Sequence, residues 1–199
     1  LETAEQHLGL AMLASLGVPA PELVGPGRAA PGDEVFLKFG LAAEAGLPVS
    51  GELLATGVER QERTREGAVL KIAANAEPGM KLPVLMTAFI GPAGKAVTVR
   101  SLHVIEVVAA LEVTLSSEGS DPDTGAFQVA ARVRNNRVRP VVAELQLSAP
   151  EGWETPPPKQ LNIAVGGEER AAFTIAPEAE AAAGSVELTA TATAGDDRV

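Results

Sequence analysis

Two histidines, His7 and His103, are the only ones in this chain that could serve acid–base chemistry. Such catalysis usually relies on histidine or on a pair of carboxylates held away from water. Neither histidine has a cysteine or the other histidine close to it in sequence to complete a set of metal ligands. We also find no G-x-S-x-G nucleophile elbow, no phosphate-binding loop and no G-x-G-x-x-G motif opening a helix. We therefore expect no catalytic residues and no cofactor in this chain.

The segment from Asp121 to Gly125 is a candidate calcium loop. Asp121 and Asp123 alternate and are followed by Gly125, which resembles the start of an EF-hand-type loop. The bidentate glutamate that such a loop needs further on is missing, because residues 127–131 are Phe, Gln, Val, Ala and Ala. Asp and Gly are also favoured in tight turns. The residues favour a hairpin turn between strands at 111–116 and 126–135 over a metal site.

Four arginines surround two asparagines in the run from Arg132 to Arg139. On a strand, Arg132 and Arg134 share one face, so two basic pairs could meet across a hairpin and bind an anion or an acidic partner. The alternative is a solvated face balanced by acids such as Glu112 and Glu144 on neighbouring strands. We favour the balanced face.

Trp153 is the single tryptophan and a candidate sugar-stacking platform. A carbohydrate site usually presents two or three coplanar aromatic rings, and no other aromatic residue lies near Trp153 in sequence. It is flanked by Pro150, Gly152 and the prolines at 156–158, where a large ring can close the end of a β-sandwich. Packing is the favoured interpretation.

The composition narrows the partners further. The net charge is −10 and the pI about 4.7, so phosphate backbones and anionic lipids are repelled and we expect no nucleic acid partner. Aromatic residues make up only 3%, which disfavours stacking sites for sugars or single strands. No apolar run approaches the roughly 18 residues of a membrane span, so we expect no membrane insertion. Cysteine is absent, which removes disulfides and thiol chemistry.

The first 18 residues predict the one helix. Thr3 and Gln6 form a capping box, and an apolar stripe recurs at helical spacing before Gly17 and Pro19 end it. The stripe consists of Leu8, Ala11, Met12, Ser15 and Leu16. It requires a packing partner, either an upstream domain or the first sandwich. We favour the upstream domain because a proline-rich linker, Pro19 to Pro21, follows at once.

From residue 22 onward the hydrophobic period changes to two, which is typical of strands. Short strands separated by Gly and Pro turns predict an all-β protein of two tandem immunoglobulin-like sandwiches, at 22–108 and 109–199, after the short helix. The expected strands of the first module are 34–41, 51–58, 68–74, 81–90 and 96–108. The charged run 59–66 is expected to be a solvated hairpin tip. In the second module the apolar side chains alternate most clearly at 127–133, 141–147, 171–175 and 186–192.

The segment 145–194 resembles the NEW3 family, an immunoglobulin-like domain associated with bacterial α-galactosidases and other carbohydrate-active enzymes. The matching features are the P-x-G-W segment ending at Trp153, the Gly166-Gly167 turn, the strand Ala171 to Ile175 before Pro177, and Gly184-Ser185-Val186 before the last strand. The family supplies no catalytic residues to carry over.

The resemblance implies a non-catalytic accessory tail of a larger carbohydrate-active enzyme, such as a glycoside hydrolase or a sugar de-N-acetylase. Its partner would be an upstream catalytic domain of the same chain, with a polysaccharide or a cell-envelope component as a further partner. The implied location is secreted or in the cell envelope, and a cytoplasmic location stays open. Two alternatives remain: an envelope or adhesion protein of stacked sandwiches, and, less favoured, a carbohydrate-binding module.

Overall fold

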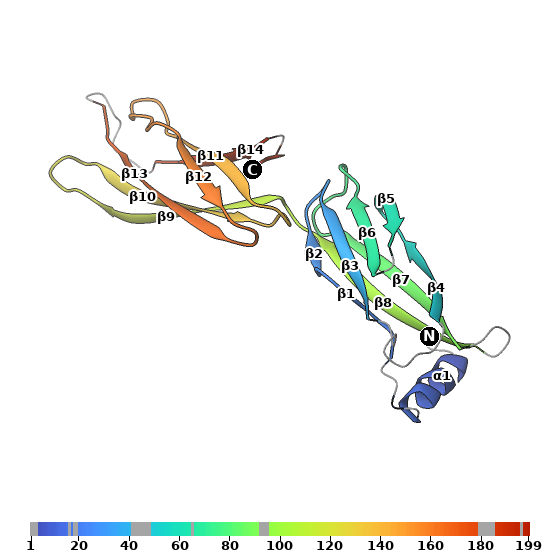
Figure 1. Cartoon of the computed structure of the whole chain (residues 1–199). Coiled ribbons are helices and arrows are strands. Elements are labelled where there is room, and N and C mark those ends of the chain that lie inside the picture. The colour runs from blue at the N-terminus through green and yellow to red at the C-terminus, as the bar shows by residue number, and fades with distance from the viewer. Residues whose placement is uncertain are drawn as a thin grey trace. The chain divides into compact units, whose positions relative to one another are not determined.

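The computed structural model describes residues 4–15, 17, 20–40, 49–64, 66–91, 96–178, 186–195 and 197–199. Strands dominate these residues and form four sheets, so the predicted all-β class is confirmed (Figure 1). The chain divides into two compact units, Leu1–Val108 and Ala109–Val199.

Unit 1 contains the helix α1 (Ala4–Ser15) and eight strands in its described residues. The strands are β1 (Glu22–Val24), β2 (Arg28–Ala29), β3 (Glu34–Gly40), β4 (Val49–Ala55), β5 (Val58–Arg63), β6 (Gly67–Ile72), β7 (Lys81–Ile90) and β8 (Val97–Val107). The strand predicted at 81–90 has the predicted bounds.

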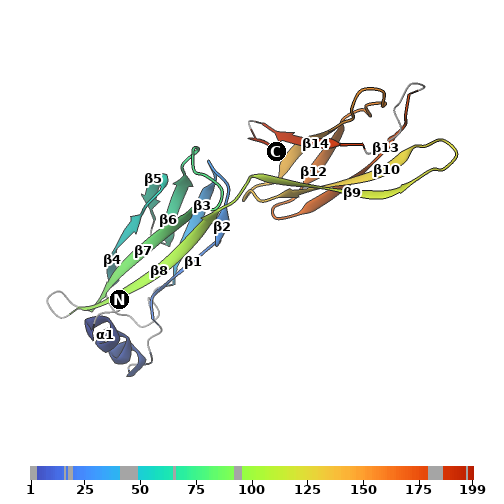
Figure 2. The same ribbon diagram turned by 180° about the vertical axis from the view of Figure 1, so that it is seen from behind.

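The strands of unit 1 form two facing sheets, seen from behind in Figure 2. Sheet A has the order β1-β3-β6-β5 and sheet B the order β2-β8-β7-β4, with β2 parallel to β8 and the other pairs antiparallel. If β1 and β2 are taken as one split first strand, this is the ABED and CFG connectivity of an immunoglobulin fold. The largest fully buried side chains between the sheets include Leu37, Leu70, Ile72, Leu82 and Ile105.

The charged run at 59–66 is a strand and not the predicted hairpin tip. Most of it belongs to β5, which pairs with β6 at the edge of sheet A and is exposed at almost every position. The backbone hydrogen bonds to β6 hold this edge strand in the sheet, although its side chains bury little apolar surface. Charged side chains on such an edge protect it from pairing with other chains. Lys71 of β6 forms an ion pair with Glu59 of this run at 3.1 Å.

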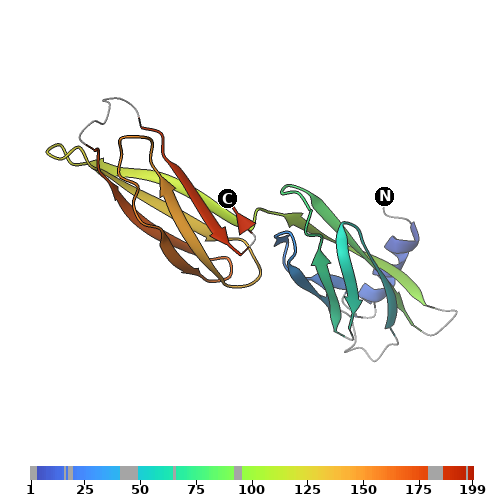
Figure 3. The same ribbon diagram turned by 90° about the horizontal axis from the view of Figure 1, so that it is seen from above.

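The helix α1 packs on the sandwich through a face that differs from the predicted stripe. Leu8 is 64% exposed and Met12 is also exposed, whereas Leu13 is buried against Ala88, Ile90 and Val99. Figure 3 shows α1 beside the strands of unit 1. We favoured an upstream domain as the packing partner of the helix, and this is wrong for the face that carries Leu13, because that face packs on the first sandwich. Thr3, Leu16 and Pro19 lie outside the described residues.

Gly9 explains which face is buried. A Cβ atom placed there would lie 2.7 Å from Cγ1 of Val97 and 3.2 Å from the carbonyl oxygen of Thr98. The missing side chain thus lets the helix backbone approach β8, and Leu13 follows one turn later on the same face. Hydrophobic spacing alone selected the wrong stripe because it scores a glycine as a gap.

Unit 2 contains seven strands in its described residues. They are β9 (Leu111–Ser120), β10 (Phe127–Asn135), β11 (Val141–Ser148), β12 (Lys159–Ile163), β13 (Glu168–Ile175), β14 (Thr189–Ala194) and β15 (Asp197–Arg198). Sheet C has the order β13-β10-β9 and sheet D the order β12-β11-β14-β15, with every pair antiparallel.

The alternating side chains of these strands meet between sheets C and D, as the sequence predicts for a sandwich. The largest fully buried members are Leu111, Leu145, Leu147, Ile163 and Ile175. The last predicted strand begins three residues late, at Thr189 instead of Val186. Its partner β11 ends at Ser148, which pairs with Thr189, and Pro150 follows soon after, so residues 186–188 have no β11 backbone to pair with.

Candidate functional site

Asp121 and Asp123 lie in the turn that joins β9 to β10. The Oδ1 atom of Asp121 accepts a hydrogen bond from the Asp123 backbone N–H at 2.9 Å, and the Gly125 N–H donates to the Asp121 carbonyl oxygen at 2.8 Å. Gly125 has a φ of +70°, a left-handed conformation that favours glycine. The Asp123 backbone N–H, and then the Thr124 hydroxyl, lower the pKa of Asp121 below its ordinary value. The carboxylate thus stabilises the turn itself.

Arg132 and Arg134 point outward from β10, in the middle of sheet C. In register, Arg134 lies between Glu112 of β9 and Glu168 of β13, and Arg132 lies 3.6 Å from the Glu168 carboxylate. Arg170 of β13 is ion-paired with Glu118. Acids from both neighbouring strands therefore surround the two arginines. Glu144, which we expected among these acids, lies on β11 in sheet D.

Arg137 does not join a basic face, contrary to the cross-hairpin pairing considered above. Strands β10 and β11 belong to different sheets, so residues 136–140 cross from sheet C to sheet D. Arg137 is only 8% exposed, and its Nε and Nη2 atoms donate to the two carboxylate oxygens of Asp197 at 2.6 and 2.5 Å. This bidentate pair ties the crossing segment to β15. Its role is to hold the last strand of unit 2 against the segment that crosses between the sheets.

Trp153 packs on the end of unit 2. Its ring centroid lies 5.4 Å from that of Phe127, with the planes tilted by 37°, and the residue contacts the core of the sandwich. A β-bridge joins it to Pro177. This half-buried arrangement with one neighbouring ring is the packing geometry that the sequence favours. Gly184 and Ser185, part of the family resemblance, lie outside the described residues.

The two histidines belong to unit 1, whereas the residues described above belong to unit 2. His7 is on the exposed side of α1, and Nε2 of His103 lies 3.0 Å from the Pro26 carbonyl oxygen. In the described part of the chain, no group of three or more His, Cys, Asp or Glu side chains could hold a metal ion. Nor does that part contain a helix with the length and apolarity needed to cross a membrane.

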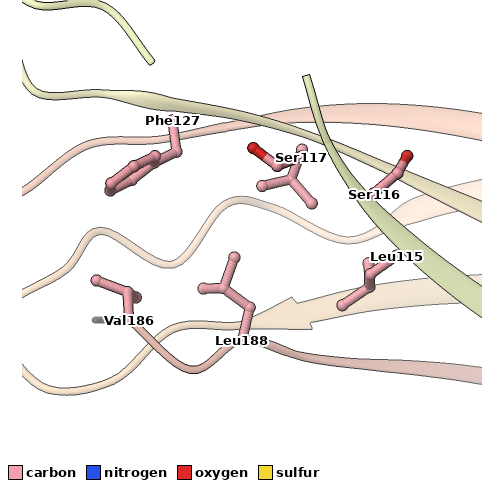
Figure 4. Close-up of a pocket in the computed structure, with 7 residues that line it drawn as sticks. Leu115, Ser116, Ser117, Phe127, Val186 and Leu188 are labelled. Carbon is pink, nitrogen blue, oxygen red and sulfur yellow. The ribbon is translucent and has the colours of Figure 1, made fainter. Parts of the chain in front are cut away.

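A groove of about 410 Å³ opens between the two sheets of unit 2 near the β9–β10 turn (Figure 4). Side chains from β9, β10 and the segment before β14 line it: Leu115, Ser116, Ser117, Phe127, Val129, Val186 and Leu188. The lining is mostly apolar, and Phe127 links it to Trp153. Its volume falls within the roughly 300–1,000 Å³ range of ligand pockets. Sequence analysis missed this groove, because the alternation identifies inward side chains without showing whether the space between them is filled.

The outer face of sheet B in unit 1 carries a second feature that the sequence did not reveal. Leu54 of β4, Leu85 of β7 and Leu102 of β8 are directly opposite one another in register and form one row across the sheet. Leu54 is 64% and Leu102 63% exposed. Val104 and Pro83 lie exposed in the adjacent row. We call these five residues the apolar row of sheet B.

An outer sheet face normally carries polar side chains. The row is bounded at one end by the Glu52–Thr87–Arg100 positions and at the other by Lys81 and Glu106. A contiguous apolar patch with a charged rim is typical of a surface that another molecule or domain covers. The row is thus the main candidate interaction surface of unit 1.

Strand order and core packing define the class: an all-β protein built of two immunoglobulin-like sandwiches. No family model matches the chain, and no curated protein matches it in sequence. Among solved structures, Escherichia coli alpha-2-macroglobulin activated by porcine elastase is 13% identical with a TM-score of 0.37, covering 88% of this chain and 20% of that one. A Salmonella alpha-2-macroglobulin mutant is 15% identical with a TM-score of 0.34, covering 87% and 15%.

The FN1-FN3 domains of chicken CNTN1 are 10% identical with a TM-score of 0.30, covering 88% of this chain and 60% of that one. The chain therefore spans between 15% and 60% of the length of these three proteins. The assignment of two sandwiches rests on the strand order within the chain itself.

Proposed function

We propose that this chain is a non-catalytic accessory module of a larger carbohydrate-active enzyme, such as a glycoside hydrolase or a sugar de-N-acetylase. It would act there as a docking module for the catalytic domain that precedes it in the same polypeptide. The class of enzyme is taken from the NEW3 resemblance of residues 145–194. The docking role is carried by the apolar row of sheet B.

The position of α1 supports a preceding domain as the occupant of the row. Gly9 and Leu13 hold the helix against β8, the strand that also carries Leu102 and Val104 of the row. Leu13 contacts Ala88, Ile90 and Val99, which alternate with the residues of the row, so α1 lies at one end of sheet B on the face opposite the row. A domain attached before α1 is tethered to this end of sheet B and would reach the row around the end of the sheet, and the tether raises its effective concentration there. Docking then needs only modest intrinsic affinity.

The test compares two glutamate substitutions in the full-length enzyme. Leu102→Glu places a charge in the row, while Val142→Glu places one at an equally exposed site on β11 of unit 2. We expect Leu102→Glu to lower the melting temperature of the catalytic domain and to speed its proteolysis, with turnover on small soluble substrates unchanged. Val142→Glu should change neither.

Two results would refute the proposal. Equal behaviour of the two variants would show that the row is not a docking surface. Cleavage or deacetylation of any glycan by the isolated 199-residue chain would show that the module is catalytic.

A further inference from the structure

Two edge strands lie on the same side of unit 1. Strand β4 is the last strand of sheet B and β5 the last strand of sheet A, as Figure 1 and Figure 2 both show. Among the described residues, no strand pairs with the outer edge of β4. Backbone groups along such an edge can pair with a strand of another chain unless something covers them.

Two side chains of β5 cover carbonyl groups of this edge. The Nε2 atom of Gln61 donates a hydrogen bond to the Leu53 carbonyl oxygen at 3.1 Å, and Nη1 of Arg63 donates one to the Gly51 carbonyl oxygen at 2.6 Å. The Arg63 guanidinium also lies 5.9 Å from the centroid of the Phe39 ring, a second attraction that holds it there. Side chains thus occupy the acceptors that an added strand would need.

Gln61 and Arg63 occupy positions where a sandwich normally carries apolar residues. In register, Gln61 lies opposite Leu70 and Arg63 opposite Ala68, and both of these partners are fully buried in the core. Residues directly opposite each other share one face of a sheet, so Gln61 and Arg63 lie on the inner face of β5. Both are nevertheless exposed, because β5 lies at the open side of the sandwich. An inward-pointing charge on an edge strand is one way in which proteins prevent strand addition.

Unit 2 contains the same arrangement on different strands. Its edge strands are β12 of sheet D and β13 of sheet C. Lys159 of β12 lies opposite the fully buried Leu145, so it too occupies an inner position, and it is exposed. Its Nζ atom donates to the Ala172 carbonyl oxygen of β13 at 2.5 Å and lies 4.9 Å from the centroid of the Phe173 ring. Both units therefore place an inner cation on a backbone carbonyl of the facing edge strand, beside a phenylalanine ring.

We propose that Gln61, Arg63 and Lys159 are edge guards, which prevent the outer edges of β4 and β13 from pairing with the same edge of a second copy of this chain. An added strand would have to take the carbonyl groups that the guards occupy, and it would displace or bury a hydrated charge. A second copy is the partner excluded, because it presents an identical edge, and antiparallel pairing about a twofold axis lets each edge complete the other.

Methionine substitutions in the 199-residue chain remove the donors of unit 1 and keep long side chains in place. We expect Gln61→Met/Arg63→Met to lower the dissociation constant of a dimer at least tenfold relative to the parent chain, as measured by sedimentation velocity over a range of concentrations. Arg60→Met is the matched control, since Arg60 lies on the outer face of the same strand and pairs there with Glu62. It should leave the dissociation constant unchanged.

Amide exchange locates the contact. Leu53 directs its N–H and C=O groups to the outer edge of β4, whereas Leu54 directs its groups to β7. In the double variant, exchange at Leu53 should become slower as the protein concentration rises, and exchange at Leu54 should be slow at every concentration. If the guards only stabilised unit 1, their loss would speed exchange in β4 with no dependence on concentration.

Lys159→Met tests unit 2 in the same way. The variant retains an apolar side chain beside Phe173 and loses the ammonium donor to Ala172. We expect at least tenfold tighter association than in the parent chain, with concentration-dependent slowing of exchange at Ala172 and not at Phe173, which directs its backbone groups to β10. Gln160→Met, an exposed neighbour on the outer face of β12, is the control and should not associate.

Each unit's guards are judged by their own variant. An unchanged dissociation constant in the methionine variant would overturn the proposal, and so would an equal gain in its control. A parent chain that already dimerises with slow exchange at Leu53 or Ala172 would show that the edge is open. A dimer in which these amides still exchange rapidly would place the contact on a sheet face, such as the apolar row of sheet B, and would also refute the proposal.

Discussion

Asn135 makes the most concentrated set of polar contacts in unit 2, so Asn135→Ala is the sharpest test of how the sandwich is held. The residue is 0% exposed. Its Nδ2 group lies 2.8 Å from the Arg139 carbonyl oxygen, 3.1 Å from that of Ala164 and 3.3 Å from that of Ile163. Its Oδ1 atom accepts the Arg137 backbone N–H at 2.9 Å. One side chain thus joins the end of β10 to the segments around β11 and β12.

The expected loss in the free energy of unfolding is about 3–4 kcal/mol. A net hydrogen bond contributes about 1 kcal/mol, and a buried group left without its partner costs about 1–3 kcal/mol more. Alanine removes every side-chain hydrogen bond that Asn135 makes, and the buried carbonyl oxygens that accepted from its Nδ2 group lose this donor. For a unit of this size, the loss corresponds to a fall in melting temperature of roughly 12–30 °C.

Urea unfolding followed by Trp153 fluorescence measures this loss, because the only tryptophan lies in unit 2. Asn162→Ala is the matched control: the same substitution on neighbouring β12, at an exposed position. It should change stability by less than about 0.5 kcal/mol. A loss below about 1 kcal/mol for Asn135→Ala would mean that water satisfies the freed carbonyl groups, and the reasoning would be wrong.

Three further predictions concern local contacts. Gly9→Leu should detach α1 from β8 and speed amide exchange in the helix, because Val97 occupies the space that a Cβ needs; unchanged exchange would contradict this. Asp197→Ala should lower the unfolding free energy of unit 2 by about 3 kcal/mol, because Arg137 loses its bidentate partner; a double-mutant cycle with Arg137→Leu should show strong coupling between the two sites. The carboxyl of Asp121 should titrate below the ordinary aspartate pKa in a ¹³C NMR titration. Because folding lowers this pKa, the carboxylate stabilises the folded state at pH values above the ordinary aspartate pKa, and this stabilisation is lost as the pH falls through the lowered pKa. Added Ca²⁺ should not shift the Asp121 resonances.

Several elements follow from local sequence with their bounds nearly as found. The strand at 81–90 and the alternating segments of unit 2 were predicted because residues two apart share a face and must bury it together. The turn at 121–125 was predicted because Asp and Gly favour its backbone conformation. In each case the deciding interaction lies within a few residues or repeats along one strand.

The errors share a physical cause, since each depended on a partner outside the segment whose pattern was analysed. The strand β5 exists because β6 offers it hydrogen bonds, although its own residues are charged. The buried face of α1 depends on the space that Gly9 leaves for Val97. Arg137 looked like part of a basic surface, and only the fold brings Asp197 to it, 60 positions away.

The sequence by itself thus determined the all-β class, the division into two halves rich in strands and the residues of the turns. These features arise from the conformational propensities of single residues and from the two-residue period of the apolar side chains. Tertiary structure alone decided the apolar row of sheet B and the groove beside β14. A row across a sheet is made by strand register, and Leu54, Leu85 and Leu102 are unrelated along the chain until β4, β7 and β8 pair. The groove is a space between sheets C and D, and the alternation along each strand does not show how closely the two sheets approach each other.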